Sequence, residues 1–127
     1  MFSNRNNAAL SNSNTVTFSI VIPTYNESEN ILRLIHEIEK KLPTDDFTEI
    51  IVVDDNSPDG TGKLVEDYIT KEVVNAQEKN SSQPNNHILK VVHRTGKEGL
   101  IPAILDGVRQ SSGTNVLIMD ADFSHPP

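Results

Sequence analysis

Residues 49–61 read EIIVVDDNSPDGT, and this stretch decides the class of fold. Its first part, Glu49–Val53, contains the run Ile50-Ile51-Val52-Val53, which is apolar without alternation, as is typical of a parallel strand covered on both faces. Asp54 and Asp55 follow, and then the turn-forming segment Ser57–Thr61 leads into a helical pattern. The stretch therefore predicts a strand, a loop and a helix in the order of a βα unit.

The same order of strand, loop and helix precedes this stretch. Phe18–Ile22 is a short β-branched run stopped by Pro23, so it predicts a buried strand. Asn26, followed three residues later by Glu29, forms a capping box that predicts the start of a helix, and Pro43 closes that helix. The apolar positions of this helix are Ile31, Ile35, Ile38 and Leu42.

Beyond residue 61 the chain predicts further helices and strands. A second helix fades near Val74, and the polar residues 75–86 predict an exposed loop. Ile88–Val92 predicts a third strand and Val116–Met119 a fourth. The apolar stripe of the second helix consists of Leu64, Val65, Tyr68 and Ile69.

A third helix, Leu100–Arg109, is predicted between the last two strands, with Gly113 in its C-terminal cap region. Its expected inward positions are Leu100, Ile104 and Val108. Four strands separated by three helices predict a Rossmann-like α/β fold, in which right-handed crossovers give a parallel sheet with helices on both faces. Ligands of such sheets bind beyond the carboxyl ends of the strands. The polar segments at those ends are Pro23–Glu27, Asp54–Asp59 and Asp120–His125.

The bulk properties of the 127-residue chain fit one domain. A formal net charge of −7 argues against nucleic-acid binding, which needs a basic stripe that the sequence lacks. Nucleotide binding stays open, because a metal ion can reverse the local sign of an acidic pocket. The sequence contains no cysteine, so any metal must bind oxygen or imidazole ligands.

Residues 1–16 are rich in Asn and Ser and predict a disordered tail, which leaves 17–127 as the folded part. No run approaches 18 consecutive apolar residues, so the sequence predicts no transmembrane helix. Any membrane contact is expected to be peripheral or to lie outside these residues.

The strongest chemical signal is the triplet Asp120, Ala121 and Asp122 at a predicted strand end. Alternation along an extended chain aims both carboxylates in the same general direction, so together they can hold a hard divalent cation. A cation that bridges a diphosphate would neutralise the charge that builds on a departing nucleoside diphosphate. Aspartates in a loop are also commonly solvated, but the place at a strand end favours the metal site.

Other polar residues at the strand ends leave two interpretations open. Asp54 either belongs to the site or caps the next helix from a solvated turn. For Asp55 we favour hydrogen bonds to a nucleotide base or ribose, because a carboxylate accepts two from neighbouring donors. Glu27 lines the site or favours the dipole of the helix that it precedes. His125 is a metal ligand, a base or a structural residue.

Arg94 and Lys97 flank Gly96 after the third predicted strand. This positive charge and flexible backbone suit a phosphate contact, and they equally suit a solvated basic loop.

Rival classes fit less well. A phospho-receiver domain carries its acid pair after the first strand and its acceptor aspartate after the third, whereas here the pair follows the second strand. Dinucleotide binding is disfavoured because Gly60 and Gly62 lack the third glycine of that fingerprint, and the chain has no phosphate-loop motif. A binding module without catalysis stays open.

Five motifs taken together, and covering Ser19 to Pro127, resemble the family 2 glycosyltransferases. They are Pro23-Thr24-Tyr25-Asn26-Glu27, Val53-Asp54-Asp55, Ser57-Pro58-Asp59-Gly60-Thr61, Arg94 with Lys97-Glu98-Gly99-Leu100, and Asp120-Ala121-Asp122-Phe123-Ser124-His125-Pro126. The resemblance implies a GT-A fold, a nucleotide-activated sugar, a requirement for Mg²⁺ or Mn²⁺, and inversion at the anomeric carbon.

The resemblance also implies roles for individual residues. Asp120 and Asp122 would be the catalytic residues and metal ligands, with Ser124 as a weak third ligand where some relatives have Gln. The nucleotide sugar would contact Pro23, Tyr25, Glu27, Val53, Asp55, Asp120, Ala121 and Asp122.

Within that family the likeness is greatest to members that load a sugar onto a polyprenyl phosphate. This implies mannose transfer from GDP-mannose to dolichyl phosphate in protein glycosylation, with glucose or another hexose as the alternative. It also implies a cytoplasmic protein that is peripheral at the cytoplasmic face of a membrane. The family continues well beyond the point that corresponds to Pro127. We therefore expect residues 1–127 alone to be a truncated domain that binds nucleotide weakly and does not transfer sugar.

Overall fold

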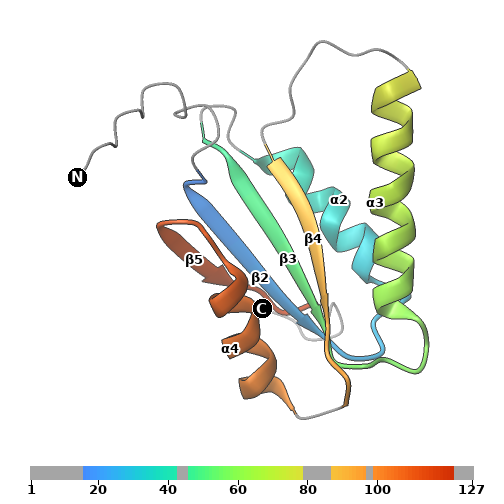
Figure 1. Ribbon diagram of the computed structural model, residues 1–127, viewed down its shortest axis with the longest axis vertical. Helices are drawn as coiled ribbons and strands as arrows, with labels where there is room; N and C mark the ends of the chain where they lie inside the picture. The colour runs from blue at the N-terminus through green and yellow to red at the C-terminus, as the bar shows by residue number, and fades with distance from the viewer. Residues whose placement is uncertain (1–15, 43–45, 79–86, 97–98, 122–127) are drawn as a thin grey trace.

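The computed structural model describes residues 16–42, 46–78, 87–96 and 99–121. β2 pairs in parallel with both β3 and β5, and β3 pairs in parallel with β4, so the strand order is β4-β3-β2-β5. The predicted parallel α/β sheet is confirmed (Figure 1). The elements in chain order are β2 (Phe18–Thr24), α2 (Ile31–Lys41), β3 (Thr48–Asp54), α3 (Thr61–Glu78), β4 (His87–His93), α4 (Leu100–Gln110) and β5 (Asn115–Ile118).

Helices cover both faces of the sheet, as predicted. α2 and α3 pack against one face and α4 packs against the other (Figure 1). Alternate residues of each central strand serve the two cores: Ile22 and Val52 face α2 and α3, whereas Val21 and Ile51 face α4. Both faces of β2 and β3 are therefore buried, which is why their central residues, Ile20–Ile22 and Ile50–Val53, form continuous apolar runs.

The predicted start of the first helix is wrong. α2 begins at Ile31 with Asn30 as its N-cap residue, and Asn30 makes no side-chain cap hydrogen bond. Asn26 lies in the left-handed region at φ 57°, and its side-chain oxygen accepts a hydrogen bond from Asp59 N at 3.3 Å. The expected capping box does not form, because the side chain of Asn26 is hydrogen-bonded to the loop after β3 instead.

The second helix is longer than predicted. α3 runs to Glu78, so residues 75–78 are helical and not part of a loop. The remainder of the predicted loop, 79–86, lies outside the described residues, as does the predicted tail up to residue 15.

The inward face predicted for the third helix is also wrong. α4 buries Ala103 and Gly107 against the sheet, while Leu100 is 62% exposed and Val108 is exposed as well. The helix lies so close to the sheet that a Cβ atom on Gly107 would come within 2.3 Å of Val21 Cγ1. Small residues therefore face the sheet, and of the three predicted inward positions only Ile104 is half-buried.

The predicted cap of this helix is corrected too. The C-cap residue is Ser111, whose amide donates to the carbonyl of Val108 at 3.1 Å. Gly113 lies beyond the cap against the start of β2, and its amide donates to Ser19 Oγ at 2.8 Å. A Cβ on Gly113 would meet the β2 backbone at 2.8 Å, so close packing requires a glycine there.

The strand order creates a switch point between β2 and β5. After β2 the chain adds β3 and then β4 on one side, and then crosses back to place β5 on the other side of β2. Loops that leave neighbouring strands in opposite directions open a crevice at such a point, and ligands of α/β sheets bind there. Among the described residues, no helix is long and apolar enough to cross a membrane.

Candidate functional site

A pocket of about 360 Å³ opens at the carboxyl ends of the strands, beside the switch point. Its walls come from the end of β2, from the segments that follow β2, β3 and β5, and from the N-terminal end of α4. Its lining residues are Pro23, Thr24, Tyr25, Glu27, Asp55, Gly99, Leu100, Ala103 and Asp120.

Five residues predicted from the sequence meet in this pocket: Pro23, Tyr25, Glu27, Asp55 and Asp120. They come from three separate strand ends, so only the fold brings them together. The ligand contacts expected of them stay predictions.

The other predicted site residues lie elsewhere. Val53 is fully buried in the core under α4, and Ala121 is buried in the core under α2 and α3. Neither side chain lines the pocket, so Val53 and Ala121 would reach a ligand only through their backbone atoms. Asp122, Ser124 and His125 lie outside the described residues.

Hydrogen bonds join the loop after β2 to the loop after β3. The amide of Asn26 donates to Ser57 Oγ at 2.9 Å, and the amide of Glu27 donates to Thr61 Oγ1 at 2.9 Å. The amide of Ser28 donates to Asp59 Oδ2 at 3.1 Å. The backbone that carries Tyr25 and Glu27 is therefore held in place by the turn segment of residues 57–61.

Asp59 is the centre of this junction. Its Oδ1 accepts from the amide of Thr61 at 3.0 Å and from the Thr61 hydroxyl at 2.5 Å, at the start of α3. Burial acts to raise the pKa of Asp59, but the hydrogen bonds from Thr61 and Ser28 outweigh it and lower the pKa below its usual value. The ionised carboxylate is thus favoured in the folded protein.

Asp54 has a structural role in the described structure. Its side chain is buried and accepts hydrogen bonds from the Ser57 amide at 3.2 Å and from Ser57 Oγ at 2.5 Å. It thereby closes the turn after β3, while Asp59 accepts hydrogen bonds from Thr61 at the start of α3. From the sequence, Asp54 is expected either to belong to the site or to cap the next helix from a turn. The structure favours the role in the turn, although Asp54 does not cap the helix.

Asp55 is held from two sides at the pocket wall. Its Oδ1 accepts from Arg94 Nε at 2.8 Å, and its Oδ2 accepts from the amide of Gly99 at 3.1 Å. The side chain of Arg94 is only 8% exposed, so the expectation of a solvated basic loop is wrong for this residue. Lys97 lies outside the described residues.

The pocket is rich in acid, with Glu27, Asp55 and Asp120 in its walls. The described residues contain no cluster of three or more His, Asp or Glu side chains that could hold a metal ion. Asp120 nevertheless suits a metal site, because it is an exposed carboxylate at the pocket, and hard cations bind carboxylate and phosphate oxygens. A bound diphosphate would add oxygens to such a site.

Sequence reasoning missed part of the wall. Thr24 has a buried hydroxyl that donates to the carbonyl of Val53 at 3.1 Å, which ties the end of β2 to β3. Ala103 reaches the pocket because α4 packs so closely on the sheet. A signal for this close packing was present in the small residues Ala103 and Gly107, which are four positions apart and share one helix face.

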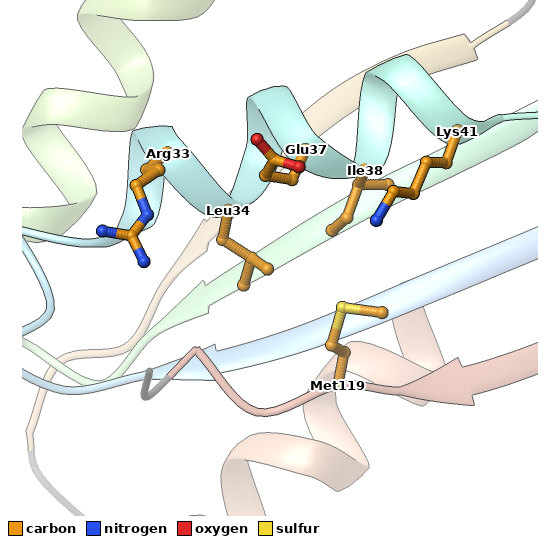
Figure 2. A pocket seen from close by; sticks show the side chains of 6 residues that line it. All are labelled: Arg33, Leu34, Glu37, Ile38, Lys41 and Met119. Carbon is orange, nitrogen blue, oxygen red and sulfur yellow. The ribbon is translucent and has the colours of Figure 1, made fainter. Parts of the chain in front are cut away.

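A second pocket of about 470 Å³ lies between α2 and the segment after β5. Figure 2 shows Leu34 and Ile38 of α2 pointing toward Met119, with charged side chains around them. None of the residues predicted for the site lines this pocket, whose polar groups are Arg33, Glu37 and Lys41. Its size alone gives no reason to prefer it to the smaller pocket at the switch point.

Comparison with known proteins agrees with this geometry. The profile of the family described as "Glycosyl transferase family 2" matches residues 19–127, which is nearly all of the chain. The chain therefore belongs to glycosyl transferase family 2. The resemblance inferred from the five motifs is confirmed.

Named relatives narrow the comparison. The chain is 40% identical over 109 residues to a dolichol-phosphate mannosyltransferase of Pyrococcus furiosus, covering 86% of this chain and 26% of the relative. It is 40% identical over 111 residues to a polyprenol monophosphomannose synthase of Mycolicibacterium smegmatis, covering 85% of this chain and 36% of the relative. The chain thus spans about a quarter to a third of the length of these relatives.

A solved structure shares the fold. The mannosyltransferase PcManGT from Pyrobaculum calidifontis, in complex with GDP-Man and Mn²⁺, superposes with a TM-score of 0.65 at 29% identity. The match covers 83% of this chain and 27% of the PcManGT chain. The GT-A class expected from the sequence is confirmed.

Proposed function

We propose that this chain forms the donor-binding part of an inverting glycosyltransferase that moves mannose from GDP-mannose to a polyprenyl phosphate such as dolichyl phosphate. One observation carries the proposal: the pocket at the switch point gathers Tyr25, Asp55 and Asp120 from three strand ends. Membership of glycosyl transferase family 2 supports the reaction type. The names of the relatives, and the GDP-Man in PcManGT, support mannose and the lipid phosphate.

The acidic walls of the pocket determine how a nucleotide sugar would bind. Carboxylates alone repel a diphosphate, so the donor would bind together with a divalent cation, Mg²⁺ or Mn²⁺, held by Asp120 with Asp122. When bound, such an ion stabilises the negative charge of the departing nucleoside diphosphate. Mn²⁺ accompanies GDP-Man in PcManGT, which supports this expectation.

The residues of the chain would act mainly by orienting the donor. Tyr25, Glu27 and Asp55 would fix the nucleoside, so that the anomeric carbon faces the acceptor. A lipid phosphate is already ionised at neutral pH, so the acceptor needs no strong general base. Positioning and leaving-group stabilisation would therefore provide most of the catalysis.

A donor screen tests this proposal. The protein expressed from its native reading frame is incubated with Mn²⁺, a short polyprenyl phosphate, and GDP-mannose, UDP-glucose or UDP-N-acetylglucosamine, each labelled in the sugar. We expect labelled lipid from GDP-mannose. Labelled lipid from UDP-glucose alone would establish the alternative of glucosyl transfer, and absence of labelled lipid from every donor would contradict the proposal.

Location is part of the same proposal. A polyprenyl phosphate acceptor resides in a membrane, so the protein would work at the cytoplasmic face, where nucleotide sugars such as GDP-mannose are present. Fractionation of cells that express the native reading frame tests this, and a signal confined to the soluble fraction would contradict it.

A further inference from the structure

Arg94 connects two walls of the pocket from behind. It follows β4, and its Nε donates to Asp55 Oδ1 at 2.8 Å. On α4, its Nη1 contacts Asp106 Oδ2 and donates to the carbonyl of Pro102 at 3.3 Å. Because its side chain is 8% exposed and is not among the pocket-lining residues, its contacts are with the protein on both sides.

The two walls also meet directly. Asp55 Oδ2 accepts a hydrogen bond from the amide of Gly99, the N-cap residue of α4. Gly99 has a φ of 101°, a conformation that favours glycine, and the carbonyl of Gly99 accepts from the Ala103 amide at 3.3 Å. The orientation of Asp55 and the position of the first turn of α4 are thus fixed together.

The charge arrangement makes Arg94 hard to replace. One guanidinium group serves Asp55, which is buried, and Asp106, whose side chain is 33% exposed. A lysine has a single ammonium group and cannot reproduce the planar set of donors that contacts both carboxylates and a carbonyl. Removing the arginine would leave the buried carboxylate of Asp55 without its cation, which is costly.

From this geometry we infer that Arg94 and Asp106 are positioning residues for nucleotide binding, acting through Asp55 and the N-terminal turn of α4. Asp55, Gly99, Leu100 and Ala103 all line the pocket, and hydrogen bonds of this connection hold Asp55, Gly99 and Ala103. The inference rests on the proposed function, because it takes the ligand to be a nucleoside diphosphate. Its physical basis is preorganisation. When the pocket wall is already fixed in the free protein, ligand binding loses less free energy to ordering the wall.

The protein from the native reading frame offers well-matched variants for a test. Asp106→Asn removes the charge of the partly exposed partner and keeps the shape, and Arg94→Lys keeps the charge and removes the planar donors. Arg109→Met is the surface control, because Arg109 is 71% exposed and contacts the same Asp106 at 3.0 Å. Lys90→Met is the stability control, because Lys90 pairs with the buried Glu49 in the same sheet at 2.8 Å.

Calorimetric titration with GDP and Mn²⁺ gives the first readout. We expect Asp106→Asn and Arg94→Lys to raise the Kd of GDP by about tenfold, and both controls to stay within about twofold of the unmodified protein. Lys90→Met is expected to lower the Tm at least as much as Asp106→Asn does, which separates positioning from loss of stability. GDP affinities unchanged in both Arg94→Lys and Asp106→Asn would overturn the inference.

Amide hydrogen exchange on the ligand-free protein gives the second readout. Asp106→Asn should speed exchange at Gly99 and in the first turn of α4, while Lys90→Met should not affect these amides selectively. Unchanged exchange there would overturn the positioning role whether or not GDP binds. Faster exchange in a protein that binds no nucleoside diphosphate would contradict the proposed function and would also overturn the link of Arg94 to nucleotide binding.

Discussion

At the scale of single residues, Asp59 shows how a loop side chain shapes the pocket without lining it. Its carboxylate accepts hydrogen bonds from Ser28 and Thr61, and its own amide donates to Asn26. The loop that carries Tyr25 and Glu27 is therefore attached to the start of α3. The conformation of the pocket depends on a residue that does not belong to its wall.

Asp59→Ala is expected to cost about 0.5–2 kcal/mol of stability, the range for loss of a side chain that accepts hydrogen bonds at a helix start. It should also weaken nucleotide binding, because the loop after β2 loses its attachment to α3. Thermal unfolding and GDP titration of the protein from its native reading frame measure both effects. Asp67→Ala, which removes only an exposed i,i+4 pair with Lys63, serves as the control on the same helix. Equal results for the two variants would contradict this account.

At the scale of elements, a buried carboxylate joins three strands and the end of a helix at the edge opposite the pocket. Glu49 of β3 accepts hydrogen bonds from Ser19 of β2 and from Ser112 after α4, and it pairs with Lys90 of β4. Burial favours the neutral acid, but the hydrogen bonds from Lys90, Ser19 and Ser112 outweigh it and lower the pKa of Glu49 to about 2.

This lowered pKa predicts acid sensitivity. The folded-state pKa of Glu49 lies below the usual 4.5, so its stabilising effect is present above pH 4.5 and is lost as the pH falls toward 2. The effect amounts to about 3 kcal/mol, at 1.36 kcal/mol for each pKa unit. Glu49→Gln should therefore flatten the fall in unfolding free energy between pH 5 and pH 2. Glu37→Gln, which removes a half-exposed surface pair with Lys40, should not flatten this fall. Parallel curves of unfolding free energy against pH for the two variants would contradict the assignment.

Local sequence patterns predicted the elements well, because periodicity and breakers act within a few residues. The four strands and the parallel sheet follow from apolar runs such as Ile50–Val53. The start of α2 and the inward face of α4 were wrong for a shared reason: contacts distant in sequence decide both. The side chain of Asn26 accepts a hydrogen bond from the amide of Asp59, and Gly107 packs against Val21.

The candidate site divides in the same way. Pro23, Tyr25, Glu27, Asp55 and Asp120 could be predicted because each lies at or just beyond the end of a strand, and parallel strands end at one edge. The pairing of Arg94 with Asp55 and Asp106 could not be predicted, because these partners are distant in sequence. Asp55 is 39 positions from Arg94, and Asp106 is 12 positions from it. Nothing in the local pattern distinguishes a buried arginine from a solvated one.

At the scale of the whole molecule, exposed large apolar side chains cluster on two surfaces of the described structure. β5 exposes Val116, Leu117 and Ile118, and in the described part of the chain β5 pairs with β2 alone. The outer side of α4 exposes Leu100, Ile101, Leu105 and Val108. Exposed strand edges and apolar patches favour association between molecules.

Residues 1–127 produced alone are therefore expected to self-associate at micromolar concentrations. Sedimentation velocity measures the association, and Leu117→Lys with Ile101→Lys should shift the population toward monomer. Val73→Lys is the control, because Val73 is exposed on α3, away from both surfaces. A monomer at all concentrations, or an equal effect of the control, would contradict this interpretation.

The central claim is that the pocket at the switch point holds a nucleoside diphosphate with a divalent cation at Asp120 and Asp122. Calorimetric titration of GDP into the protein from its native reading frame, with and without Mn²⁺, tests it directly. The account predicts binding that requires Mn²⁺ and that is lost in Asp120→Ala and in Asp122→Ala, with both variants still folded. GDP affinity that is the same without Mn²⁺, or that is unchanged in both variants, would contradict it.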